Sequence, residues 1–105
     1  LDRMEHIDLV RADAFVFANT TTATFDLIVV DLFADLDFAQ GVETPDFLQA
    51  IRRLASPSGR VLLNTVVHDE KSAQRSARLW DELRLVFTEV KEHHYDGSNR
   101  VFIAL

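Results

Sequence analysis

The stretch FDLIVVDLFAD, residues 25–35, decides the fold of this chain. Residues 27–30 are all aliphatic and do not alternate with polar residues, which is typical of a central parallel strand covered on both faces. We therefore expect a strand over residues 26–31. Ligands of parallel α/β sheets bind at the carboxyl ends of the strands, and this strand ends on a carboxylate. Asp31 is accordingly the first candidate for a functional residue.

Strands and helices alternate along the rest of the chain. Thr44 can cap a helix and Pro45 suits its first position, so a helix is expected before the SPSG segment at residues 56–59. The expected helices cover residues 14–18, 45–55 and 72–87, with a loop over residues 19–24. The expected strands cover residues 6–11, 26–31, 60–67, 88–95 and 100–105, and the turn DGSN joins the last two. This order predicts an α/β fold with a mainly parallel sheet, helices on both faces and a C-terminal antiparallel hairpin.

Length and composition narrow the classes of protein. The 105 residues make one small domain, and 48% hydrophobic against 27% charged residues is typical of a globular protein. No apolar run approaches the roughly 20 residues of a membrane span. A net charge of −6 argues against a nucleic acid ligand. Because cysteine is absent, disulfides and thiolate metal sites are excluded, and the cytoplasm is the expected compartment.

Four motifs occur in an informative order. They are Asp13-Ala14 after the first strand, FDLIVVDLF, a helix ending in SPSG before RVLLN, and the last strand NRVFIAL. Together they resemble the C-terminal part of a spermidine synthase-like protein of the S-adenosylmethionine-dependent methyltransferase fold. The resemblance covers about residues 6–105. It implies a partial Rossmann-like fold, alkyl transfer (aminopropyl or methyl) to an amine, and S-adenosylmethionine or decarboxylated S-adenosylmethionine as cofactor of the complete protein.

The resemblance also implies roles for single residues. Asp13 would receive the adenine amino group, and the backbone amide of Ala14 would meet the ring. Asp31 would be the catalytic acid that orients and deprotonates the attacking amine. Asp31 and Leu32 would also contact the cofactor.

Two features depart from the family pattern. The family has a second Asp three residues after the catalytic one, where this chain has Ala34, so the acids left for the acceptor pocket are Asp35 and Asp37. The Gly-rich loop of the complete fold is also absent, since none of the three glycines lies within three residues of another. We therefore expect residues 1–105 to be a single domain, the C-terminal part of the fold, and to be inactive alone. The strand at residues 26–31 would then have an open apolar edge, which predicts a homodimer or a rearranged sheet.

The residues themselves also allow simpler roles. Asp13 could cap the helix that begins at Ala14, and Asp31 could cap a nearby loop. Asp35 and Asp37 could lie in a solvated loop. Asn64 lies inside a strand and is expected to be structural. The run His68-Asp69-Glu70 has residue types that bind metals, but no second ligand cluster accompanies it, so no metal site is predicted.

Two other functions stay open. The first is a non-catalytic dimerisation module built on the same half-fold. The second is a receiver-like domain, in which Asp31 would accept a phosphoryl group and Thr65 would supply the switch hydroxyl.

Overall fold

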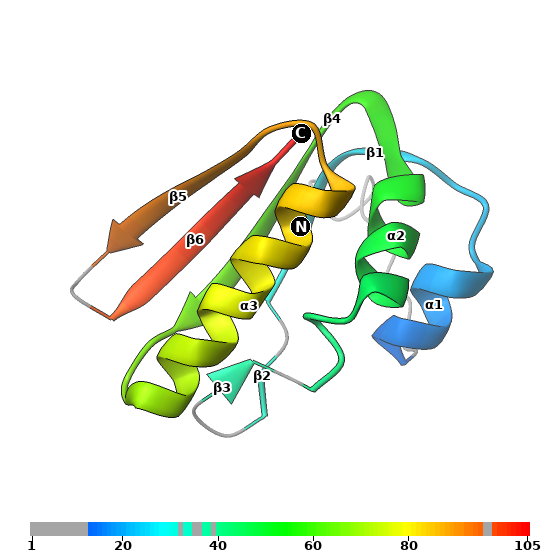
Figure 1. The fold of residues 1–105 in the computed structure, drawn as a ribbon. Helices are drawn as coiled ribbons and strands as arrows, with labels where there is room; N and C mark the ends of the chain where they lie inside the picture. Colours follow the sequence, from blue (N-terminus) through cyan, green and yellow to red (C-terminus); the bar gives the residue numbers. More distant parts are fainter. Residues whose placement is uncertain (1–12, 32, 35–36, 39, 96–97) are drawn as a thin grey trace, which may run out of the picture.

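The structure is a computed structural model, and it describes residues 13–31, 33–34, 37–38, 40–95 and 98–105. The expected strand at residues 6–11 lies outside this part of the chain. The described elements are α1 (Ala14–Thr20), β1 (Phe25–Val30), β2 (Phe33–Ala34), β3 (Asp37–Phe38), α2 (Pro45–Leu54), β4 (Ala55–Val66), α3 (Glu70–Val86), β5 (Val90–Tyr95) and β6 (Asn99–Ala104) (Figure 1).

Four of the described strands form one sheet in the order β1-β4-β6-β5. β1 and β4 are parallel, with Ile28 beside Val61 and Val30 beside Leu63. β6 pairs antiparallel with both β4 and β5, while β2 and β3 form a separate ribbon. The predicted α/β class and its closing hairpin are confirmed. β1, β4 and β5 run in the same direction and β6 runs opposite to them, so the four described strands make a mixed sheet that is mainly parallel, with β6 of the hairpin between β4 and β5.

The helices that the structure describes lie on one face of the sheet, where α2 packs against α1 and α3 (Figure 1). Burial along the strands follows this arrangement. Val61 and Leu63 are buried, whereas Leu62 between them is partly exposed. Likewise Val30 is 6% exposed and Val29 is 63% exposed. For the described residues, the expectation of helices on both faces is thus corrected. Two right-handed crossovers that advance in the same direction, β1-α2-β4 and β4-α3-β5, must place both helices on the same face.

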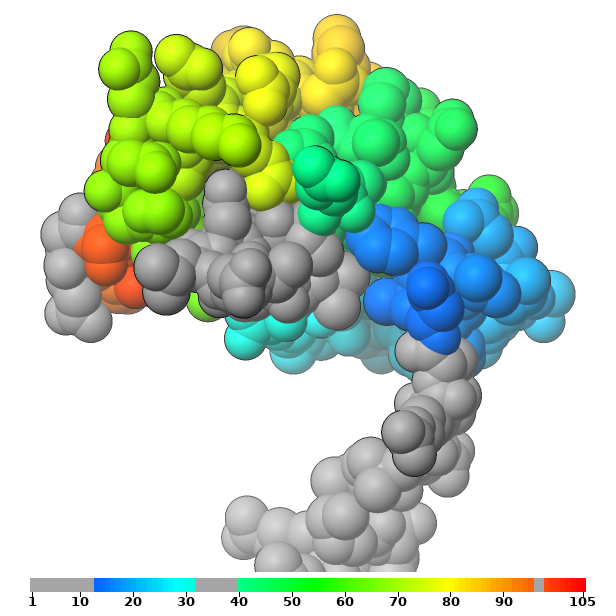
Figure 2. Space-filling model, turned by 90° about the horizontal axis from the view of Figure 1, so that it is seen from below, coloured from blue at the N-terminus to red at the C-terminus, as the bar shows by residue number. Residues whose placement is uncertain are grey.

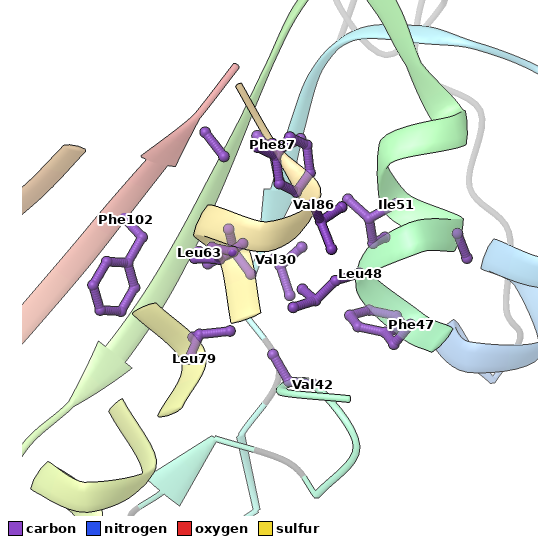
Figure 3. Close-up of a cluster of buried hydrophobic side chains, with 14 of the residues drawn as sticks. Val30, Val42, Phe47, Leu48, Ile51, Leu63, Leu79, Val86, Phe87 and Phe102 are labelled. Carbon is purple, nitrogen blue, oxygen red and sulfur yellow. The ribbon is translucent and has the colours of Figure 1, made fainter. Parts of the chain in front are cut away.

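The hydrophobic core fills the space between the sheet and this helix layer (Figure 3). Phe102 of β6, Leu63 of β4, Leu48 of α2 and Leu79 of α3 are almost completely buried. Burying one such side chain contributes about 1.5–3 kcal/mol to folding. The core therefore fixes the strand ends relative to the helices, and the open face of the sheet contributes little to it.

α1 is longer than expected. The loop predicted over residues 19–24 begins after α1, because the helix continues through Asn19 to Thr20. The Asn19 side chain donates to the carbonyl of Phe15 at 2.7 Å, and the Thr20 hydroxyl donates to the carbonyl of Val16 at 2.8 Å. These polar side chains bond to the preceding turn, so residues that usually favour loops prolong the helix here.

β4 starts directly after α2, and the SPSG segment forms an irregularity inside it. Phe25 pairs with Ala55, but Leu27 pairs with Arg60, so the register between β1 and β4 shifts across this segment. A Cβ atom on Gly59 would lie 2.9 Å from the carbonyl oxygen of Phe25. Glycine is required at this position because the two strands approach too closely for a side chain.

A partly buried ion pair joins the segment before α2 to α3. The Nε atom of Arg75 donates to Oε2 of Glu43 at 2.8 Å, and the Gly41 amide donates to Oε1 at 3.2 Å. Burial raises the pKa of Glu43, but the hydrogen bond and charge of Arg75, together with backbone amides, outweigh this effect and lower the pKa overall. The folded state therefore favours the ionised carboxylate.

This lowered pKa predicts an acid-dependent loss of stability. Glu43 contributes stability at pH values above the ordinary pKa of 4.5, and the contribution is lost as the pH falls below that value. Glu43→Gln should lower the free energy of unfolding by about 2 kcal/mol at neutral pH, and the difference from the wild type should narrow in acid. Urea unfolding across this pH range measures both effects. Glu82→Gln, farther along α3, is the control, and an equal loss at all pH values would contradict the assignment.

Candidate functional site

Asp31 follows β1 directly, at the carboxyl end of the parallel pair β1–β4, and its side chain is exposed. Its Oδ1 atom accepts a hydrogen bond from Nδ2 of Asn64 on β4 at 3.4 Å. Asn64 in turn accepts through Oδ1 from Nδ2 of Asn99 on β6 at 3.3 Å. The structure thus joins one carboxylate and two amides from neighbouring strands. Sequence reasoning treated Asn64 as structural and did not propose Asn99 for the site, although an amide directly after the apolar residues 61–63 was a usable signal.

Asp13 is the N-cap of α1. Its Oδ1 atom accepts from the backbone amides of Phe15 at 2.8 Å and Val16 at 3.2 Å. The capping role that the residue type alone allowed is therefore present. Within the part of the chain that the structure describes, no hydrogen bond links Asp13 to Asp31, and none engages Oδ2 of Asp13. That oxygen is left as an acceptor beside the first residue of the helix, Ala14.

An apolar cavity of about 310 Å³ lies between α1, β1 and α2. Its walls come from one side of α1, from Phe47, Ile51 and Leu54 of α2, and from the apolar residues of β1. Seen from below, α1 (blue) lies beside β1 (cyan) and the start of α2 (Figure 2). Because the wall includes successive residues of β1 on both of its faces, the cavity runs along the outer edge of that strand.

Three further residues predicted for the site, Leu32, Asp35 and Asp37, lie in or beside the segment of the short strands β2 and β3. Leu32 and Asp35 lie outside the described residues, and Asp37 is the first residue of β3, where it pairs with Ala34 of β2. The assignment of Leu32 to the cofactor, and of Asp35 and Asp37 to the acceptor pocket, stays a prediction.

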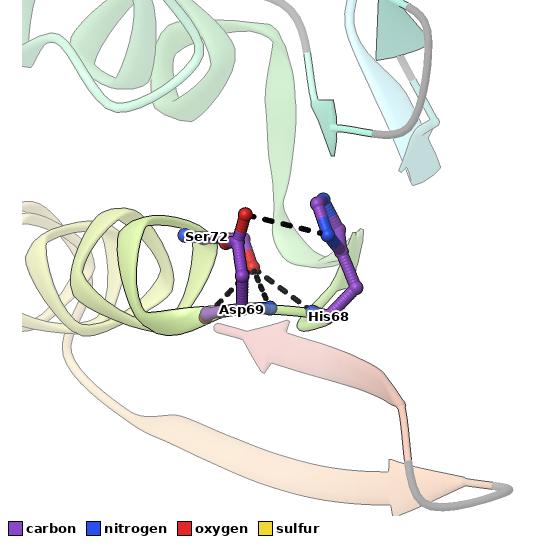
Figure 4. A network of polar contacts seen from close by, with 3 residues as sticks. All are labelled: His68, Asp69 and Ser72. Carbon is purple, nitrogen blue, oxygen red and sulfur yellow. Dashed lines mark hydrogen bonds and ion pairs between the residues drawn. The ribbon is translucent and has the colours of Figure 1, made fainter.

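Asp69 and Ser72 form a capping box at the start of α3, and the backbone amide of His68 also donates to Oγ of Ser72 at 2.9 Å (Figure 4). The Ser72 amide donates to Oδ1 of Asp69 at 2.8 Å, and Oγ of Ser72 accepts from the Asp69 amide at 3.1 Å. The backbone amide of Ser72, together with its side chain, lowers the pKa of Asp69. Across the described ranges, no group of three or more His, Asp or Glu side chains could hold a metal ion. The acid of this run is thus used to cap the helix.

Thr65 does not lie at the open edge of the sheet. It is completely buried, its hydroxyl donates to the carbonyl of Arg100 at 3.0 Å, and it shares a hydrogen bond with Ser76 at 3.3 Å. A switch hydroxyl must reach a phosphorylated side chain, so this burial argues against the receiver-like interpretation.

No helix in the described part of the chain is long and apolar enough to cross a membrane.

Comparison with known proteins shows the fold. Human methyltransferase-like protein 13, solved in complex with SAH, superposes with a TM-score of 0.71 at 19% sequence identity. The chain has a methyltransferase-like fold. The match covers 89% of this chain and 46% of that one, so the chain spans about half the length of the protein it matches. No protein-family model and no curated protein matches the sequence.

Proposed function

We propose that this chain is the C-terminal part of an S-adenosylmethionine-dependent transferase of spermidine synthase type, which acts on a small amine. The observation that carries the proposal is the exposed carboxylate of Asp31 at the carboxyl end of β1, held by the amide of Asn64. The methyltransferase-like fold supports it, since ligands of such sheets bind at this edge.

Asp31 has the chemistry to hold and deprotonate an amine. An ionised carboxylate accepts hydrogen bonds from an ammonium group, and it can take one proton as the amine becomes a nucleophile. Asn64 donates a hydrogen bond to Oδ1 of Asp31, so Oδ2 of the same carboxylate is available to the acceptor. The role of the protein is then to position the amine and to receive its proton.

The residues around α1 fit the nucleoside part of the cofactor. The amide groups of α1 occupy Oδ1 of Asp13 and leave Oδ2 as an acceptor for the adenine amino group, and Ala14 offers a small side chain beside the ring. Bound S-adenosylmethionine, or its decarboxylated form, supplies an electrophilic carbon next to a sulfonium. Because the 105 residues contain no Gly-rich loop, the isolated chain should bind nucleoside and amine without turnover.

Charge and composition support a small cationic acceptor in the cytoplasm. The net charge of −6 favours a cation over a nucleic acid, and the absence of cysteine suits a reducing compartment.

The amine assignment predicts a specific effect of Asp31→Asn. The amide keeps the shape of the side chain but loses its charge, so the affinity for 1,4-diaminobutane should fall by about tenfold. Calorimetric titration of the 105-residue chain measures this change. Asp81→Asn, which removes an exposed charge from α3, is the matched control. Equal binding by the wild type and Asp31→Asn would contradict the proposal.

The nucleoside assignment predicts that 5′-methylthioadenosine binds the chain through Asp13. Asp13→Ser keeps a good helix cap but removes Oδ2, so it should weaken binding about tenfold with little loss of stability. Asp13→Ala should weaken binding equally and also lower the free energy of unfolding by about 1 kcal/mol. Calorimetry and urea unfolding measure the two effects. Full binding by Asp13→Ser would show that Asp13 only caps α1.

A specific observation also favours the second candidate, a dimerisation module. Among the described strands β1 pairs with β4 alone, and Leu27 and Val29 of β1 are 57% and 63% exposed. An apolar edge with an apolar cavity beside it can pair with the same edge of a second copy. A homodimer would bury both features, with or without catalysis at the strand end.

The dimer interpretation predicts a concentration-dependent change of mass. Val29→Lys places a charge on the edge strand and should raise the dissociation constant of the dimer by at least about tenfold. Leu85→Lys, at a position on α3 that is 79% exposed, should leave it unchanged. Sedimentation equilibrium measures both constants. A wild-type chain that stays monomeric at every concentration would rule out the homodimer.

A further inference from the structure

A row of three polar side chains crosses the open face of the sheet near the carboxyl end of β1. Asp31 follows β1, Asn64 lies on β4, and Asn99 is the first residue of β6. Asn64 pairs with Val101, and Asn99 pairs with Val66, so the two amides are diagonal neighbours on adjacent strands. Hydrogen bonds of 3.3 Å and 3.4 Å connect the row from β6 through β4 to Asp31.

The direction of these hydrogen bonds follows from the chemistry of the three groups. An ionised carboxylate can only accept, so the group of Asn64 that faces Asp31 must be its NH₂. The carbonyl oxygen of Asn64 then points the other way, and it accepts from the NH₂ of Asn99. Asn99 thus fixes the orientation in which Asn64 donates to the carboxylate. All the donors in the row point toward Asp31.

Asn99 ends the turn DGSN, where an amide is common, but the sheet does not require an amide at position 64. Asn is disfavoured in strands, and the neighbouring positions on this face of β4 are the apolar residues Leu62 and Val66. Asn64 and Asn99 are only partly buried, so the core does not require them. Their shared contact is with each other and with the carboxylate at the end of the adjacent strand.

We propose that Asn64, oriented by Asn99, is a positioning residue for Asp31. It holds Oδ1 of the carboxylate so that Oδ2 faces the ammonium group of the acceptor. This inference rests on the proposed amine function and adds two residues to that site. An ordered carboxylate loses less conformational freedom when the amine binds, and the affinity for the amine is higher for that reason.

The contact can be tested without a ligand. In nuclear magnetic resonance spectra of the 105-residue chain, the side-chain NH₂ signals of Asn64 should differ between the wild type and Asp31→Asn. The change that Asp31→Asn causes in these signals should be smaller in a chain that also carries Asn99→Ala. Signals of Asn64 that are identical in the wild type and Asp31→Asn would overturn the proposal.

The effect on the acceptor is tested with 1,4-diaminobutane. Asn64→Ala should weaken its binding about fivefold and Asn99→Ala about twofold to threefold, since a hydrogen bond to a charged group is lost or loosened. The double variant should bind no more weakly than Asn64→Ala, because Asn99 acts through Asn64. Asn19→Ala on α1 is the control. Additive losses, or unchanged binding in Asn64→Ala, would overturn the positioning role.

The two experiments separate the failure of this inference from that of the proposed function. If the Asn64 signals change in Asp31→Asn but the wild type does not bind the diamine, the amine function is wrong and the Asn64–Asp31 contact stands. If the wild type binds the diamine through Asp31 but Asn64→Ala binds it equally well, the amine function stands and the positioning role is wrong.

Discussion

The parallel pairing of β1 with β4 is the constraint on which the rest of the structure depends. Two parallel neighbours need a crossover, which α2 provides, and the right-handed rule decides the face on which α2 lies. The same pairing brings the carboxyl ends of the two strands together. Asp31 therefore lies beside Asn64, although 33 positions separate them in the sequence. The fold alone thus brings the residues of the candidate site together.

Polar contacts secure this arrangement where the core cannot. The Glu43–Arg75 pair ties the segment before α2 to α3, and the hydroxyl of Thr65 links β4 to β6 and shares a hydrogen bond with Ser76 on α3. In the described residues, no buried side-chain nitrogen or oxygen lacks a hydrogen-bond partner. Buried polar groups that are fully paired favour a single arrangement, since any shift would leave one unsatisfied. These contacts thus hold the helix layer in a fixed position relative to the strand ends.

Local signals predicted much of the fold and less of the site. Thr44 and Pro45 marked the start of α2, and the unbroken apolar run of residues 27–30 marked β1, because capping and periodicity act over a few residues. The insertion of β6 between two other strands and the register shift at Gly59 depend on contacts between distant segments, which no local pattern encodes. The Asn64–Asn99 contact was missed for the same reason.

The two roles proposed for β1 are physically compatible: its edge can pair with a second copy, and the carboxylate at its end can bind an amine. Acids bracket its apolar residues, and Asp26 is already occupied by a 2.6 Å hydrogen bond from the Ser56 hydroxyl. A strand that pairs along the outer edge of residues 27–30 would bury Leu27 and Val29, which favours association. Covering Asp31 as well would take a carboxylate out of water at a cost of several kcal/mol. Association through β1 is therefore expected to stop at Val30, which leaves the carboxylate and its row of amides open to a ligand.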